Sequence, residues 1–229
     1  MGGRGSSSSS SRTVANQATA RPQINAQNLS QAQVDAIIDQ QEDDFTIDQS
    51  LAAKQYISAR DTGNGYSMSQ NLNYKLENGG SLNANERFME QQLSSAMHPL
   101  GQDTVLHRAA HSDLITALGV QNYQSMTDAQ LSQALVGASW DSKSFTSTSY
   151  DRSKNPFISG SQAGGREVVM RIHASGSARG VFVNKAQAEV VLARGTHFEI
   201  TGASFTGSTK YPRATGRPMR EVVLDVDVW

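Results

Sequence analysis

The sequence changes its periodicity near residue 100, and this change constrains the fold more than any other feature. Apolar residues recur at helical spacing before that point, whereas short runs of β-branched and aromatic residues separated by turn residues follow it. Helices first and strands later, without regular alternation, predict an α+β fold in which the helices pack on a mixed or antiparallel β-sandwich core. A parallel, doubly wound sheet is not expected.

The pattern predicts four helices, then strands interrupted by two short helices. The first expected helix begins after Ser30, and the second runs from Ile47 to Ile57 with Leu51 in its apolar stripe. The third lies near Ser69 to Leu76, and the fourth runs from about Ala84 to Met97. The expected strands are Thr104 to Ala110, Lys143 to Ser149, Glu167 to His173, Val181 to Val183, Ala188 to Ala193, His197 to Ile200 and Glu221 to Trp229. The short helices are expected at about Ser112 to Leu118 and Asp128 to Leu135.

Residues 1–28 form a Gly- and Ser-rich stretch with too little apolar surface to offset the entropy of ordering. We expect a disordered tail there, followed by a single domain over residues 29–229. Its helical part would cover residues 29–100 and its sheet core residues 101–229. At 37% apolar content, a chain of this length can bury one such core.

Composition excludes several classes of site. The formal net charge is −1, so no overall field supports binding to nucleic acid, although it is not excluded, and cysteine is absent, which removes thiol chemistry. No long apolar stretch indicates a Sec signal or a membrane span, so we expect synthesis in the cytoplasm and no membrane partner. His107 and His111 have no third ligand beside them, so no metal is expected. The glycines of residues 160–165 do not match a dinucleotide fingerprint.

Three patches place polar residues in or beside apolar strands. Arg108 lies in the run Val105 to Ala109, where a guanidinium needs an anionic partner, either a pyrophosphate or a protein carboxylate. The second patch is the run Ser144 to Tyr150. Alternation of side chains in this run predicts that Phe145, Ser147 and Ser149 share one face of a strand. Hydroxyl groups on an inner face can orient a carboxylate, although strands rich in Ser and Thr are also common at sheet edges.

The third patch is Gln187-Ala188-Glu189, which enters the apolar run Val190 to Ala193. The spacing of two predicts that the amide and the carboxylate share a face at the start of a strand. A solvated strand end is the alternative interpretation.

In this order, an arginine, then Ser-Thr-Ser, then Gln-x-Glu entering a strand that continues Val-Leu-x-Arg-Gly-Thr resembles the exoenzyme class of bacterial and phage mono-ADP-ribosyltransferases. The resemblance covers about residues 46–229 and includes the Gly65-Tyr66 turn. It implies an enzyme that cleaves NAD, its substrate, and transfers ADP-ribose to a macromolecular acceptor, here expected to be a protein.

The resemblance also implies roles for individual residues. Arg108 would bind the pyrophosphate, the backbone of Ala109 would meet the nicotinamide amide, and Ser147 would hold Glu189. Glu189 would stabilise the cationic transition state, and Gln187 would orient the acceptor. The implied aromatic residue over the nicotinamide is Phe157, with Tyr150 as its competitor.

Gln187 is a departure from members that modify arginine, which carry glutamate there, because an amide supplies neither a base nor a charge partner. The Gln form resembles the clostridial exoenzymes that modify asparagine on Rho GTPases. A non-arginine acceptor, such as asparagine, and a small GTPase partner are therefore implied. Phe182 would correspond to an aromatic residue that often precedes this glutamine in the Rho-modifying members.

Two other functions stay open on the sequence. One is an NAD glycohydrolase that uses water as the acceptor. The other is a non-catalytic interaction protein with the same fold, associated with a virion or delivered into a host cell as an effector.

Overall fold

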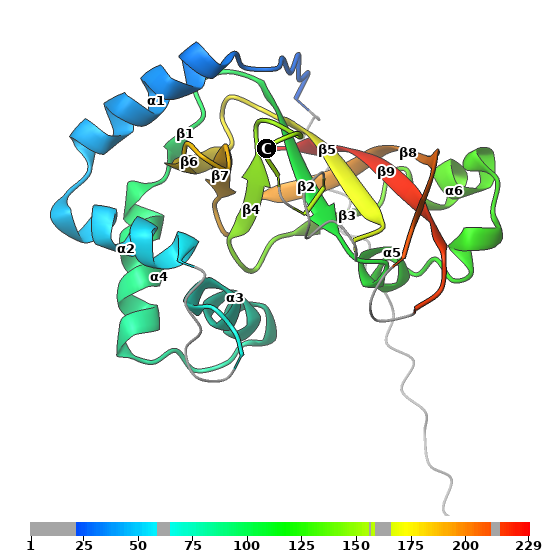
Figure 1. Ribbon diagram of the computed structural model, residues 1–229, viewed down its shortest axis with the longest axis horizontal. Coiled ribbons are helices and arrows are strands. Elements are labelled where there is room, and N and C mark those ends of the chain that lie inside the picture. Colours follow the sequence, from blue (N-terminus) through cyan, green and yellow to red (C-terminus); the bar gives the residue numbers. More distant parts are fainter. Residues whose placement is uncertain (1–21, 59–64, 156, 159–165, 212–215) are drawn as a thin grey trace, which may run out of the picture.

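A computed structural model describes residues 22–58, 65–155, 157–158, 166–211 and 216–229 (Figure 1). The part of the expected disordered tail that covers residues 1–21 lies outside the described residues. Residues 22–28 are described and contact the sheet: the backbone N–H of Asn25 donates to Asp103 Oδ2 at 2.7 Å, and Gln27 forms a parallel bridge with Thr104. The paired part of the chain therefore begins before Leu29.

Within the described residues, six α-helices form, and each buries at least one apolar residue. They are α1 (Gln31–Asp44), α2 (Ile47–Ile57), α3 (Met68–Asn78), α4 (Ala84–Ala96), α5 (Asp113–Ala117) and α6 (Asp128–Leu135), with a 3₁₀ turn η1 at Tyr123–Ser125. All but α5 begin with a capping box, in which a Ser, Thr or Asn side chain accepts the backbone N–H of a Gln or Glu three residues later. The four expected N-terminal helices are therefore confirmed.

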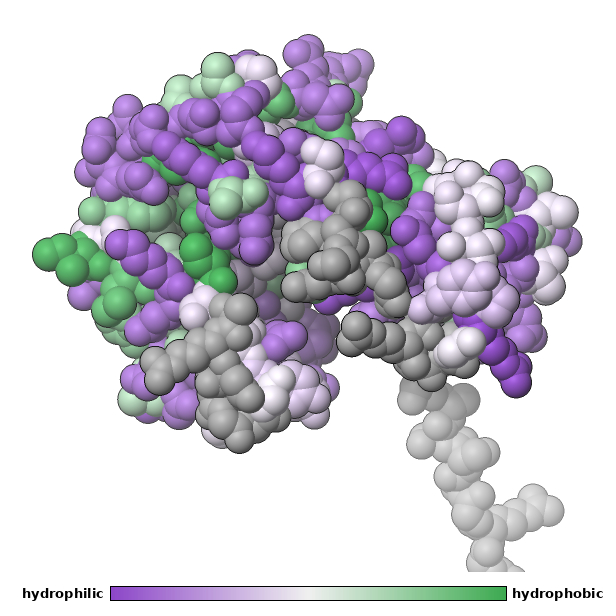
Figure 2. Space-filling model, in the orientation of Figure 1, coloured by the Kyte–Doolittle hydropathy of each residue, from purple (hydrophilic) through white to green (hydrophobic). Residues whose placement is uncertain are grey.

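Helices α2, α3 and α4 bury their apolar stripes against one face of the sheet. Tyr56, Leu72 and Met89 pack there in one cluster with Val181 and Val191. The expected stripe of α2 is wrong at one residue, because Leu51 is 45% exposed, and Ile47 one turn earlier is 87% exposed. Figure 2 shows apolar side chains at the surface where α1 leads into α2.

Nine strands form one mixed sheet in the order β1-β6-β7-β4-β2-β5-β9-β8-β3. Their bounds are β1 (His98–Pro99), β2 (Thr104–Ala110), β3 (Ser139–Asp141), β4 (Thr146–Ser149), β5 (Val168–Ala174), β6 (Arg179–Asn184), β7 (Glu189–Leu192), β8 (His197–Lys210) and β9 (Met219–Val228). Of these nine strands, only β5 and β9 pair in parallel. The mixed sheet with helices at its sides confirms the expected α+β class (Figure 1).

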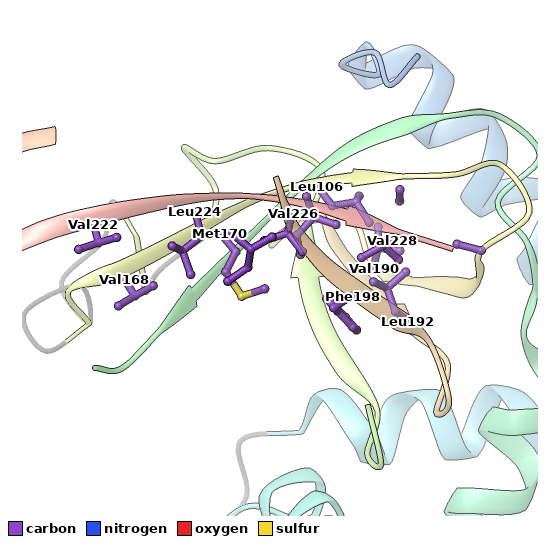
Figure 3. Packing of buried hydrophobic residues seen from close by; sticks show 14 of the residues in the cluster. Leu106, Val168, Met170, Val190, Leu192, Phe198, Val222, Leu224, Val226 and Val228 are labelled. Carbon is purple, nitrogen blue, oxygen red and sulfur yellow. The ribbon is translucent and has the colours of Figure 1, made fainter. Parts of the chain in front are cut away.

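The sheet has two halves whose backbones pair at a single pair of residues. Strands β2 and β4 are paired only at His107 and Ser149, whereas every residue of β2 pairs with β5. The halves pack on each other: Val190 and Leu192 of β7 lie in one buried cluster with Phe198, Val226 and Val228 of the other half (Figure 3). The arrangement is the expected sandwich, built from one continuous order of strands.

Three strands differ from the expected ones. The two-residue strand β1 was not expected and pairs with β6. Strand β8 continues to Lys210, although apolar alternation predicts its end at Ile200, because its outer part pairs with β9 through the backbone while many of its side chains remain exposed. Strand β3 was not expected; its Trp140 stacks on Phe198 of β8 with ring centroids 5.1 Å apart. Both pairings extend the β9 side of the sheet.

Candidate active site

Arg108 lies in β2 beside the point where the two halves of the sheet meet. Its Nη1 donates to the backbone carbonyl of Ser147 at 2.7 Å. Among the described residues, no carboxylate lies within ion-pair distance of this guanidinium. The alternative interpretation, an arginine paired with a protein carboxylate, is therefore not observed among these residues. Removal from water lowers the pKa of Arg108, while Tyr56 and Glu189 act to raise it.

The pairing of β2 with β4 ends after His107 and Ser149, and two arginine side chains donate hydrogen bonds to backbone carbonyls beyond that pair. Because His107 lies opposite Ser149, a continued antiparallel ladder would bring Ala109 opposite Ser147, but those residues do not pair. The carbonyl of Ser147 accepts from Arg108 instead, and the carbonyl of Ala109 accepts from Arg166 Nη1 at 3.1 Å. Beyond this pair the facing backbones of β2 and β4 are therefore not joined, and a guanidinium group binds a carbonyl oxygen of each strand.

Glu189 begins β7, the neighbour of β4, and its carboxylate is half-buried. Burial raises the pKa of Glu189, and a hydrogen bond with the side chain of Ser147 and the charge of Arg108 oppose that rise. The alternation expected for β4 is observed, since Phe145 packs toward the helices while Tyr150 lies in the opposite cluster. The structure thus brings Arg108, Ser147 and Glu189 together.

Two residues of this cluster were missed by the sequence reasoning, because both are on helices. The hydroxyl of Tyr56 on α2 lies 3.3 Å from Ser147 Oγ, and Asn73 Nδ2 on α3 donates to that hydroxyl at 2.9 Å. Tyr56 is only 2% exposed, and burial raises the pKa of its hydroxyl. Asn73 Oδ1 is buried and has no hydrogen-bond partner among the described residues. The available signal was a tyrosine within an apolar helix stripe, which is typical of an ordinary core residue.

The placement of Gln187 differs from the expected one. Gln187 lies in a turn and is exposed, and β7 begins only at Glu189. Between them Ala188 is fully buried with φ 53°, a left-handed conformation that breaks strand alternation. The prediction that amide and carboxylate share a strand face is therefore wrong.

Hydrogen bonds fix the turn that carries Gln187. Asn184 Oδ1 accepts the backbone N–H groups of Ala186 and Gln187 at 2.9 and 3.2 Å, and Ser149 Oγ donates to the carbonyl of Gln187 at 3.1 Å. Lys185 forms an ion pair with Asp39 of α1. Gln187 is thus held at the surface two residues before Glu189.

The two candidates for the aromatic residue have different environments. Tyr150 is 5% exposed in the sheet core, and its hydroxyl donates to Gln31 of α1 at 2.9 Å. Phe157 is half-buried and packs in one cluster with Ala109 and Ile158. The guanidinium carbon of Arg166 lies 4.1 Å from the centre of the Phe157 ring. Of the two rings, Phe157 is the one beside Ala109.

Phe182 does not lie where the Rho-modifying analogy implies. It belongs to β6, is 3% exposed and packs in the sheet core, and its backbone N–H donates to Gln41 Oε1 at 3.0 Å. No face of this ring is offered to an acceptor.

The cluster can perform two kinds of chemistry. A guanidinium with donors left over suits a phosphate group, and an ionised carboxylate held by a hydroxyl can stabilise a positive charge that develops at a sugar carbon. Within the described residues, no three His, Asp or Glu side chains are grouped to hold a metal ion. No helix in the described part of the chain is both long and apolar enough to cross a membrane.

Comparisons with known proteins identify the fold and the family. No curated protein matches the sequence. Among solved structures, Plx2a, an ADP-ribosyltransferase toxin from Paenibacillus larvae, is similar with a TM-score of 0.60 and 14% identity, covering 85% of this chain and 92% of that one. The C3 exoenzyme of Clostridium limosum has a TM-score of 0.57 and 16% identity, with 91% and 98% covered. C3stau2 from S. aureus with NAD has a TM-score of 0.57 and 16% identity, with 89% and 98% covered.

These likenesses, at low identity, show the fold. A family model supplies the membership: residues 23–215 match the ADP-ribosyltransferase exoenzyme model, and that range contains every residue of the cluster described above. The chain belongs to the ADP-ribosyltransferase exoenzyme family.

Proposed function

We propose that the protein cleaves NAD and transfers its ADP-ribose to a protein acceptor through a residue other than arginine, with asparagine as the first candidate. One observation carries the proposal: Arg108, Ser147 and Glu189, from three different strands, lie together where the pairing of β2 and β4 ends, and an exposed Gln187 lies two residues before Glu189. Family membership supplies the reaction class and NAD as its substrate.

The residues divide the work on NAD. The donors of Arg108 would bind the pyrophosphate, and Phe157 with the backbone of Ala109 would receive the nicotinamide. As the bond between the ribose C1′ and the nicotinamide nitrogen breaks, the electron pair leaves with nicotinamide and positive charge develops on the ribose. Glu189, oriented by Ser147, would stabilise that charge.

Gln187 would bind the acceptor. Its side chain is neutral and exposed, and it can pair with an amide by both donating and accepting a hydrogen bond. In transfer to asparagine, the amide nitrogen forms the new bond to C1′ and loses a proton to solvent water. The Gln-x-Glu turn supports a small GTPase as the acceptor class. Phe182 adds no support, because its ring is buried.

The test uses labelled NAD, a cell lysate, and the wild-type and Glu189→Gln proteins side by side. We expect label on a protein, at a residue identified by mass spectrometry, and transfer at least about 100-fold slower for the variant. Nicotinamide release without label on any macromolecule would favour the glycohydrolase. Absence of nicotinamide release would favour a non-catalytic interaction protein, either virion-associated or delivered as an effector.

A further inference from the structure

Two large apolar side chains lie exposed together on α2. Ile47, the first residue of the helix, is 87% exposed, and Leu51, one turn later, is 45% exposed. Their spacing of four residues places them next to each other on one face of the helix. Apolar side chains gather at the surface where α1 leads into α2 (Figure 2). An exposed apolar patch with polar residues around it is typical of a surface that binds another protein.

The segment that carries this patch is held in place by both caps and packing. The Thr46 side chain accepts the backbone N–H of Gln49 at 3.2 Å, and Gln49 Oε1 accepts the backbone N–H of Thr46 at 2.9 Å. Gln49 Nε2 donates to Ser95 of α4 at 3.0 Å, and Phe45 packs on the buried cluster of the helical layer. Covering the patch therefore costs little ordering of the chain beneath it.

The residues around the patch carry negative charge. Residues 22–53 contain no lysine, arginine or histidine. Four carboxylate side chains are exposed where α1 ends and α2 begins, those of Glu42, Asp43, Asp44 and Asp48. In the described part of the chain, no cation lies within ion-pair distance of these four groups. A partner that covers the apolar patch must therefore bring basic side chains around its own apolar contact, because like charges there would oppose binding.

Helix α1 connects the patch to the turn that carries Gln187. Asp35, Asp39 and Asp43 recur every four residues and so lie along one side of the helix. Asp39 forms an ion pair with Lys185, two residues before Gln187 in the turn. Acidic groups thus extend from this turn to the start of α2. A protein that brings one of its side chains to Gln187 would lie beside the same helix.

We propose that the patch of Ile47 and Leu51, with the carboxylates beside it, is a docking surface for the acceptor protein, which presents basic side chains around an apolar contact. The inference rests on the proposed function, because it takes Gln187 as the residue that binds the acceptor. Docking here supplies affinity for the protein as a whole, whereas Gln187 orients the side chain that is modified. The patch contains no residue of the cluster around Glu189, so it can be altered without changing the NAD site.

The experiment measures transfer to the acceptor that carries the label in the lysate experiment, after that protein has been purified. Ile47→Ser removes the more exposed apolar side chain, and Asp43→Lys reverses one charge. For each variant we expect KM for the acceptor to rise by about fivefold, while nicotinamide release without acceptor stays within about twofold of the wild-type rate. Added salt should raise KM for the wild type, and less so for Asp43→Lys, because salt screens the attraction that this variant lacks.

Two control variants change matched side chains elsewhere. Val136→Ser alters an apolar side chain that is 47% exposed at the end of α6, on the opposite side of the molecule from α2 (Figure 1). Asp141→Lys reverses a charge on β3, at the other end of the strand order from β6, which α1 and α2 contact. Neither control should change KM. Thermal melting checks the fold of each variant, and the second patch variant carries the test if the first does not fold.

A raised KM for both patch variants, with both controls unchanged, supports the inference. Unchanged KM for Ile47→Ser and Asp43→Lys would overturn it and leave the proposed function intact, and a wild-type KM that does not depend on salt would overturn the basic character of the partner. Sedimentation tests a second copy of this chain as the occupant: self-association that Ile47→Ser abolishes, with KM unchanged, would also overturn the inference. If the wild type releases nicotinamide but labels no protein, the proposed function fails and the inference fails with it.

Discussion

The hydroxyl of Tyr56 on α2 lies 3.3 Å from the hydroxyl of Ser147 on β4, although the two residues are 91 positions apart in the chain. The side chain of Ser147 also acts to lower the pKa of Glu189, which places its hydroxyl beside this carboxylate. The helical layer therefore reaches the carboxylate through one hydroxyl group, and Tyr56 acts as a positioning residue in this arrangement.

Replacing Tyr56 with Phe tests that positioning. The ring contact with Phe145, edge to face at 6.0 Å, would remain, but the hydrogen bonds to Ser147 and Asn73 would be lost. We expect kcat for nicotinamide release to fall by about 3- to 10-fold, the worth of one or two hydrogen bonds, with KM for NAD little changed. Tyr74→Phe, at a tyrosine that is 71% exposed, is the matched control. A loss of melting temperature without a loss of kcat would assign Tyr56 a structural role only.

Replacing Arg108 with Ala should weaken NAD binding by about 2 kcal/mol, because a bidentate charged contact to the pyrophosphate is lost. Calorimetry with NAD and with ADP-ribose measures the change, and both ligands should lose affinity equally since they share the pyrophosphate. Undiminished affinity for both ligands would show that Arg108 serves only as a hydrogen-bond donor to the carbonyl of Ser147.

The activity should fall in acid at a higher pH than an exposed glutamate would allow. Burial raises the pKa of Glu189, and only its ionised form can stabilise a developing cation, so activity should be lost as the pH falls through this raised value. The same shift has a consequence for stability. The folded state holds this proton more tightly than the unfolded state, so ionisation of Glu189 reduces stability as the pH rises.

Glu189→Gln should therefore melt at neutral pH at a temperature no lower than that of the wild type. Its advantage over the wild type should disappear in acid, where Glu189 is protonated as well. Kinetic profiles of nicotinamide release and melting curves between pH 4 and pH 8 measure both effects, with the ends of this range chosen about the ordinary carboxylate pKa. A clearly lower melting temperature of the variant at neutral pH would contradict the raised pKa.

Gln187 should separate targeting from NAD chemistry. Gln187→Ala should abolish transfer to protein and spare slow hydrolysis of NAD, since the side chain is exposed in the turn rather than paired in the sheet. Gln187→Glu should keep hydrolysis and add weak modification of arginine analogues, because the carboxylate provides a charge partner and a base. Nicotinamide release and label transfer are followed separately in both variants. Joint loss of both activities in Gln187→Ala would place Gln187 in the NAD site.

The sequence predicted the fold where side-chain periodicity and structure coincide. The helices were placed well because caps such as Ser30 and Thr46 lie next to amphipathic runs. The outer part of β8, from Thr201 to Lys210, could not be recognised, because it is held by backbone pairing with β9 and carries few buried side chains. Pairing between distant strands has no local signature in such a segment.

The site was predictable as far as its motifs lie on strands. Arg108, Ser147 and Glu189 were singled out as polar residues in or beside apolar strands, and the family resemblance implied their roles. The structure places the three residues together. Tyr56 could not be found in this way, because a buried tyrosine on a helix stripe looks like core. The predicted orientation of Gln187 was wrong, because the positive φ of Ala188 cannot be foreseen from strand alternation.

The single residue pair that joins β2 to β4 also affects how the molecule opens. A cooperative sheet protects its amides from exchange with solvent through unbroken ladders, and that protection is weakest where a ladder ends. Here the least protected boundary runs beside His107 and Ser149, next to the proposed NAD site, so a bound dinucleotide would link the two halves of the sheet. Amide exchange along the facing edges of β2 and β4 should consequently slow when NAD binds, while amides between β5 and β9 keep the rates they have without ligand.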